Sequence, residues 1–92
     1  MKLKSNIAIS DNGFLFNPET GDSYTVNLVA RDIIRLMQGG MTYPELEPII
    51  LGKYEVSDLM LERDYHDLAR TLEVFNLLET NTESDETNMP QN

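Results

Sequence analysis

The sequence contains no cysteine and only one histidine. These shortages exclude a disulfide framework and a zinc site built from thiolates and imidazoles, and the lack of cysteine fits a reducing compartment. No apolar run approaches the roughly 18 residues that cross a bilayer. The opening stretch MKLKSNIAIS is too short and too polar for a signal peptide. We therefore expect a cytoplasmic protein.

Basic residues are also scarce. Seven lysines and arginines face sixteen acidic residues, which gives a formal net charge of -9. Such a chain repels a phosphate backbone wherever no local basic patch shields it, so nucleic acid is a disfavoured partner. With 92 residues, of which 40% are hydrophobic, the chain is large enough for one small globular domain.

Turn signals divide the first third of the chain into three short strands. Alternation in NIAIS and FLF predicts the first two strands, and Asp11-Asn12-Gly13 predicts the turn between them. A second turn at residues 18–22 leads into a third strand at residues 23–26. We expect a three-stranded antiparallel meander.

Capping residues and apolar spacing predict three helices after the strands. Asn27 caps the first, at about residues 28–38, with Arg31, Asp32 and Arg35 facing outward. The capping box TYPE starts the second at about Tyr43, and its internal proline predicts a kink. The third helix runs from Ser57 or Asp58 to about Phe75 and ends at Asn76, with the following apolar stripe: Leu61, Tyr65, Leu68, Leu72 and Phe75.

This order of elements predicts an α+β, winged-helix-like fold in which a three-stranded antiparallel sheet is followed by three helices. We expect the domain to span residues 1–79. Residues 80–92, TNTESDETNMPQN from Thr80 onward, have almost no apolar side chain and are predicted to form a disordered acidic polar tail.

The charged residues of the third helix do not form a recognisable catalytic site. His66 and Asp67 are neighbours and therefore point in different directions, and no serine or cysteine is spaced to act as a nucleophile beside them. A solvated charged face explains them better. We predict no catalytic residue, no metal site and no cofactor, and we expect a monomer while leaving a dimer open.

The third strand is the more informative feature. In a meander its outer backbone groups are unpaired, and neither lysine nor proline guards residues 23–26. Such an edge is either an ordinary exposed edge of a small sheet or the place where a partner strand adds. Periodicity alone leaves both readings open.

Between about residues 9 and 78 the chain follows a pattern that begins with a strand ending in an aliphatic-Asn pair and a helix closing in glycine. The positions that carry this pattern are Val26-Asn27, Ala30, Ile33, Leu36, Gly39, Thr42, Glu45-Leu46, Ile50, Tyr54-Glu55-Val56, Asp64, Leu68, Leu72 and Leu77. At these positions the chain resembles PqqD-like proteins, the peptide chaperones of pyrroloquinoline quinone (PQQ) biosynthesis, and the wider group of RiPP precursor peptide recognition elements. The chain departs from the family pattern at Ile34, at Pro48 and at Asn76, which replaces a glycine.

This resemblance implies a non-catalytic protein that binds the leader of a ribosomally made precursor peptide and presents it to a modifying enzyme, with a radical SAM enzyme as the expected partner. The leader would add as a strand to the third strand and lay side chains against the third helix. The implied binding residues are Ser23, Tyr24, Thr25, Val26, Leu61, Tyr65, Leu68 and Leu72.

The alternative function is a winged-helix regulator that binds DNA. Such a protein needs basic and amide side chains on the helix that enters a groove. The second helix instead carries Glu45 and Glu47, with only Lys53 near its end. A gel shift at low salt distinguishes the two functions.

Overall fold

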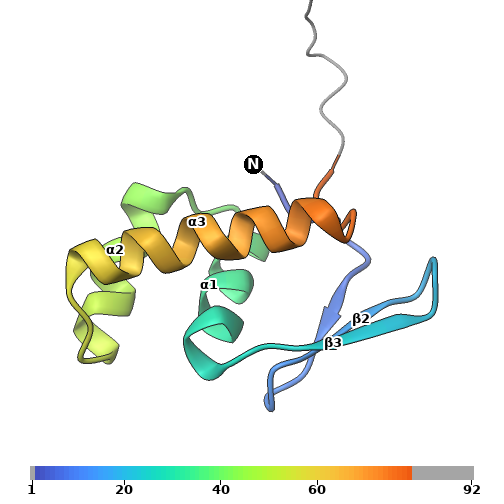
Figure 1. Cartoon of the computed structure of the whole chain (residues 1–92), viewed down its shortest axis with the longest axis horizontal. Coiled ribbons are helices and arrows are strands. Elements are labelled where there is room, and N and C mark those ends of the chain that lie inside the picture. Colours follow the sequence, from blue (N-terminus) through green and yellow to red (C-terminus); the bar gives the residue numbers. More distant parts are fainter. Residues whose placement is uncertain (1, 80–92) are drawn as a thin grey trace, which may run out of the picture.

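The computed structural model describes residues 2–79, and the predicted tail at residues 80–92 lies outside them. Along the chain the three strands come first and the three helices follow, which confirms the expected α+β fold (Figure 1). The elements are β1 (Ala8–Ile9), β2 (Phe14–Asn17), β3 (Asp22–Thr25), α1 (Leu28–Gln38), α2 (Tyr43–Lys53) and α3 (Asp58–Val74).

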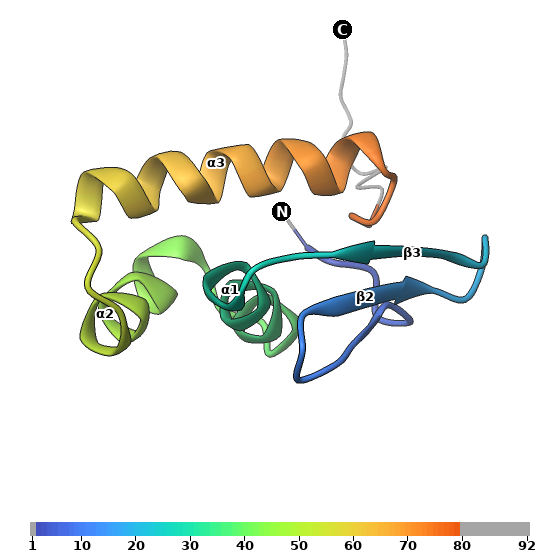
Figure 2. The same cartoon turned by 60° about the horizontal axis from the view of Figure 1, so that its bottom comes forward.

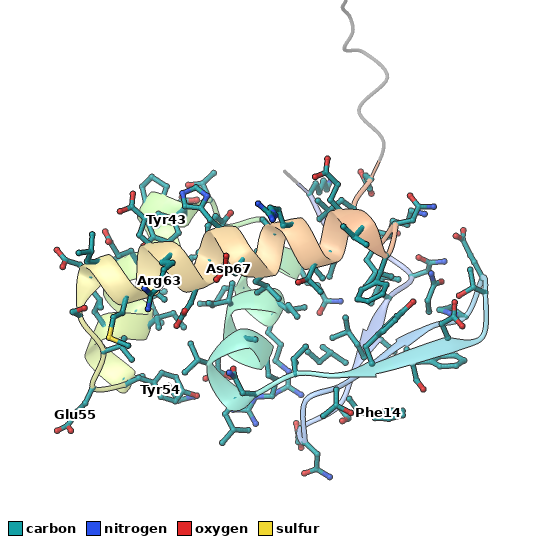
Figure 3. All side chains as sticks on the ribbon, viewed as in Figure 1. Phe14, Tyr43, Tyr54, Glu55, Arg63 and Asp67 are labelled. Carbon is teal, nitrogen blue, oxygen red and sulfur yellow. The ribbon has the colours of Figure 1, made fainter. Side chains whose placement is uncertain are left out.

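The three strands form an antiparallel meander in the order β1-β2-β3. Side chains alternate along β2, so Leu15 is buried while Phe14 lies on the side of the sheet away from α3 (Figure 3). The turn before β2 requires Gly13, whose φ is +81°. A Cβ at this position would collide with the carbonyl oxygen of Val26, so no other residue lets the chain approach so closely.

Helix α1 begins and ends as its sequence predicts. The Asn27 side-chain oxygen accepts a hydrogen bond from the Ala30 N–H at 2.8 Å. Ile33, Ile34 and Met37 recur at helical spacing and are buried in the core. Helix α1 therefore begins directly after β3, and its buried side chains form part of the core against which α3 packs.

Helix α2 is continuous from Tyr43 to Lys53, and the expected kink at Pro48 does not divide it. Its first turn is held by Glu45, whose carboxylate accepts a hydrogen bond from the Thr42 N–H at 2.8 Å. Pro48 is the sixth of the eleven residues of the helix, and it removes only the amide that would donate to the Pro44 carbonyl, so the rest of the hydrogen-bond ladder continues on both sides.

Helix α3 is the longest element and lies across α1 and alongside β3 (Figures 1 and 2). The Ser57 side chain accepts a hydrogen bond from the Met60 N–H at 3.1 Å and so caps its start. Asn76, with a φ of 60°, ends the helix in the left-handed conformation that the sequence predicts. Leu77 then returns to the core.

Asp32 is buried, so the expectation that it faces solvent is wrong. Three donors surround its carboxylate: the Tyr54 hydroxyl at 2.5 Å, the Lys53 Nζ at 2.8 Å and the Arg31 guanidinium at 2.9 Å. Burial alone would raise the pKa of Asp32, but hydrogen bonds from these groups outweigh it and lower the pKa from 3.8 to about 2. The carboxylate thus joins α1 to the end of α2.

This depressed pKa predicts a pH-dependent share of stability. The unfolded chain takes up the Asp32 proton at higher pH than the folded chain, so the contribution is complete above about pH 4 and is lost as the pH falls toward 2. Asp32→Asn should lower the free energy of unfolding at pH 7 by about 2 kcal/mol. Urea unfolding from pH 7 to pH 2 measures the difference, with Glu73→Gln on the exposed face of α3 as control. A difference from wild type that stays constant over this range would contradict the assignment.

Candidate functional site

Strand β3 forms an open edge of the sheet. The strand order β1-β2-β3 leaves it paired on one side only, within the described residues 2–79. No lysine or proline occurs in its four residues, Asp22–Thr25. Edges of this kind are a ready template for an additional strand. The open edge faces the region between β3 and α3 (Figure 2).

The register of the hairpin shows which backbone groups of β3 are free. The Val26 N–H donates to the Gly13 carbonyl at 2.8 Å, and Phe14 pairs with Thr25 one position further along. Since backbone groups alternate in direction along an antiparallel strand, the N–H and C=O groups of Ser23 and Thr25 point away from β2. No turn, cap or side-chain hydrogen bond found across residues 2–79 uses these four groups.

The Tyr24 side chain connects β3 to the end of α3. Tyr24 pairs with the buried Leu15, which places both side chains on the inner face of the sheet. Its ring lies against that of Phe75, with the ring centroids 4.5 Å apart. This aromatic pair closes the space between β3 and α3 at the C-terminal end of the helix.

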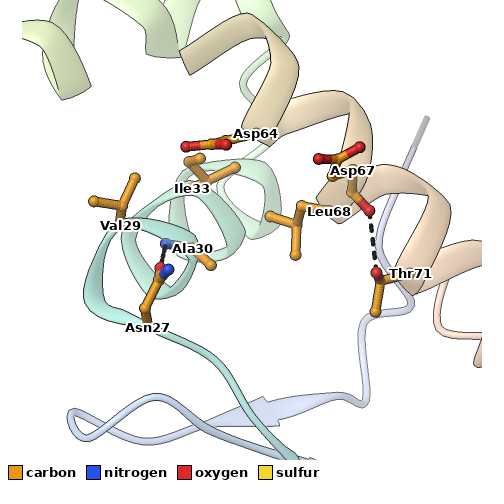
Figure 4. A pocket seen from close by; sticks show the side chains of 8 residues that line it. All are labelled: Asn27, Val29, Ala30, Ile33, Asp64, Asp67, Leu68 and Thr71. Carbon is orange, nitrogen blue, oxygen red and sulfur yellow. Dashed lines mark hydrogen bonds between the residues drawn. The ribbon is translucent and has the colours of Figure 1, made fainter. Parts of the chain in front are cut away.

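A hollow of about 290 Å³ opens between α1 and α3 (Figure 4). Its floor is aliphatic, and its rim is polar and carries two carboxylates. We call it the α1–α3 hollow. The floor consists of Val29, Ala30, Ile33 and Leu68, and the rim consists of Asn27, Asp64, Asp67 and Thr71.

A second depression, of about 370 Å³, continues along α3 toward the Tyr24–Phe75 pair. It shares Asp67 and Thr71 with the α1–α3 hollow and is otherwise lined by Arg70, Val74 and Phe75. The two depressions form one groove, which we call the α3 groove. Its length is marked by residues three or four apart on one side of the helix: Asp64, Asp67, Leu68, Thr71 and Phe75.

Only one of the four α3 residues predicted to contact a peptide lines this groove, namely Leu68. Leu61 and Leu72 are at most 1% exposed and belong to the core, so they have no surface to offer a ligand. Tyr65 instead packs against Tyr43 of α2, with the ring centroids 4.6 Å apart.

The strand residues separate by face. Tyr24 and Val26 pack against the core, and the side chains of Ser23 and Thr25 lie on the outer face with Phe14.

The groove residues Asp64, Thr71 and Phe75 were not predicted as a binding set. The available signal was their helical spacing, which places them about a sixth of a turn around α3 from the core stripe.

The described residues hold no group of three or more histidine, aspartate or glutamate side chains that could bind a metal ion. Between residues 2 and 79, no helix has both the length and the apolar character needed to cross a membrane. The candidate site thus consists of the open backbone edge of β3 and the α3 groove beside it.

No family model matches the chain, and no curated protein matches it. Among solved structures, the chain is similar to TbiB1 in complex with the TbiA(beta) leader peptide. The two are 29% identical, with a TM-score of 0.74, and the match covers 86% of this chain and 95% of that chain. The likeness supports the RiPP recognition element fold that the sequence resemblance implies, and it does not single out PqqD.

Proposed function

We propose that this protein is a non-catalytic recognition protein that binds the leader of a ribosomally made precursor peptide and presents it to a modifying enzyme. One observation carries the proposal: the unpaired edge of β3 lies beside the α3 groove in a fold similar to that of TbiB1, whose structure holds a leader peptide.

Strand addition explains how such an edge and groove work together. The free N–H and C=O groups of Ser23 and Thr25 would pair with the peptide backbone, which gives register and affinity that depend little on the peptide's sequence. Alternate peptide side chains would then point into the α3 groove and toward Leu68. Specificity would come from the groove.

The partners follow from this role. The chain would hold the precursor's leader while a separate enzyme modifies another part of the same peptide. The resemblance to PqqD-like proteins favours a radical SAM enzyme as that partner, in the biosynthesis of PQQ or of a related peptide-derived product. The protein itself would need no cofactor.

The test is a titration of the isotope-labelled protein with synthetic leader peptides from candidate precursors. We expect backbone amide shifts at residues 22–27 and along the groove face of α3, because these residues gain new contacts. The shifts should saturate with a single dissociation constant. Residues of α2 that face away from the groove, such as Ile49, serve as internal controls.

Two results would contradict the proposal. The first is the absence of shifts at β3 and α3 with every candidate leader at millimolar concentration. The second is a gel shift with genomic DNA fragments at low salt, which would favour the alternative DNA-binding function.

A further inference from the structure

Building on the proposed function, we infer that the α1–α3 hollow selects a lysine or arginine side chain of the leader. We base this inference on one observation: the same hollow has an aliphatic floor and, at its rim, two carboxylates. Lysine and arginine have this same division, since a hydrocarbon stem carries the charge at its end.

The floor suits the stem. Val29 and Leu68 are only partly buried and line the hollow above the buried Ile33, so both present hydrocarbon to an entering chain (Figure 4). A volume of about 290 Å³ accommodates a long unbranched side chain rather than a methyl group. Burying methylene groups there would stabilise the complex, because it removes apolar surface from water.

The rim suits the charge. Asp64 and Asp67 are three residues apart on a helix, so their side chains are neighbours on the same face. Neither takes part in any of the ion pairs found in residues 2–79. Arg63 and Arg70 lie one turn before Asp67 and one turn after it, and they make no ion pair with it. Both carboxylates are therefore available to a cation from the peptide.

Other side chains fit this hollow less well. An acidic side chain would be repelled by the two carboxylates, and a purely apolar one would cover them without compensating their charge. A peptide strand paired with the β3 edge directs every second side chain toward α3, so one position of the leader would carry the basic residue.

The test uses a display library of random twelve-residue peptides, selected on the immobilised full chain. We compare wild type, Asp64→Asn/Asp67→Asn and the matched control Glu62→Gln/Glu73→Gln. The control makes the same change of net charge on the opposite face of α3. Peptides that also fail to bind Thr25→Pro are retained, because their binding depends on the β3 edge.

We expect the retained peptides to carry lysine or arginine at one fixed position when selected on wild type or on the control. Replacing that lysine by norleucine, which keeps the stem, should weaken binding to both proteins about fivefold at low salt. On Asp64→Asn/Asp67→Asn the same replacement should change the dissociation constant less than about twofold.

Two outcomes separate this inference from the proposed function. Retained peptides without a fixed basic position, or an equal norleucine effect on all three proteins, would overturn the inference and leave strand addition intact. A selection that yields no peptide sensitive to Thr25→Pro would contradict strand addition, and the inference would fall with it.

Discussion

Thr25→Pro is expected to weaken binding of a leader peptide at least about 30-fold while the protein remains folded. The Thr25 N–H points away from β2, so proline removes no hydrogen bond of the hairpin. It does remove one donor to the added strand, and its ring occupies the space of the incoming backbone. A loss of about 2 kcal/mol in binding free energy corresponds to this change in the dissociation constant.

Thr25→Val is the matched control because it keeps the N–H and the branched Cβ. We expect it to bind the same peptide as tightly as wild type in fluorescence anisotropy. Both variants should unfold within about 1 kcal/mol of wild type in urea, since edge positions tolerate proline where the N–H is free. Equal affinities of Thr25→Pro and Thr25→Val would show that the backbone of β3 is not the binding element.

Leu61→Ala and Leu68→Ala should separate the core of α3 from its groove. Leu61 is fully buried, so truncation to alanine should lower the free energy of unfolding by about 2 to 5 kcal/mol. Leu68 is only partly buried and lines the α1–α3 hollow. Its truncation should cost less than about 2 kcal/mol of stability and weaken peptide binding about tenfold.

The measurements are urea unfolding for stability and peptide titration at a temperature where both variants are folded. We expect opposite results for the two variants. Leu61→Ala should lose stability and bind peptide normally once folded, whereas Leu68→Ala should keep most of its stability and bind peptide more weakly. A Leu61→Ala variant that folds as well as wild type and binds peptide poorly would return Leu61 to the binding set.

The sequence predicts this fold well where local chemistry decides the structure. Asn27 and Ser57 accept the free amide hydrogens of helix starts, and Asn76 takes the left-handed conformation that ends α3. Each of these features depends on residues close together in the chain. For the same reason the turn signals correctly predict a three-stranded antiparallel sheet.

The sequence does not determine how far α3 is rotated about its own axis. The apolar stripe predicted the buried side of the helix, and Leu61 and Leu72 are indeed buried. The groove lies next to this stripe, and its position depends on how α3 crosses α1. Similarly, the pairing of Asp32 with Lys53 and Tyr54 joins residues more than twenty positions apart. Periodicity within one helix cannot show such a contact.

The most direct test of strand addition is hydrogen exchange at individual β3 amides, with and without a bound leader peptide. In the free protein the Ser23 and Thr25 amides should exchange rapidly, whereas the Tyr24 amide, which points toward β2, should already be protected. A saturating peptide should slow exchange at Ser23 and Thr25 at least about tenfold. A peptide that binds tightly and leaves both amides exchanging as in the free protein would contradict strand addition at β3.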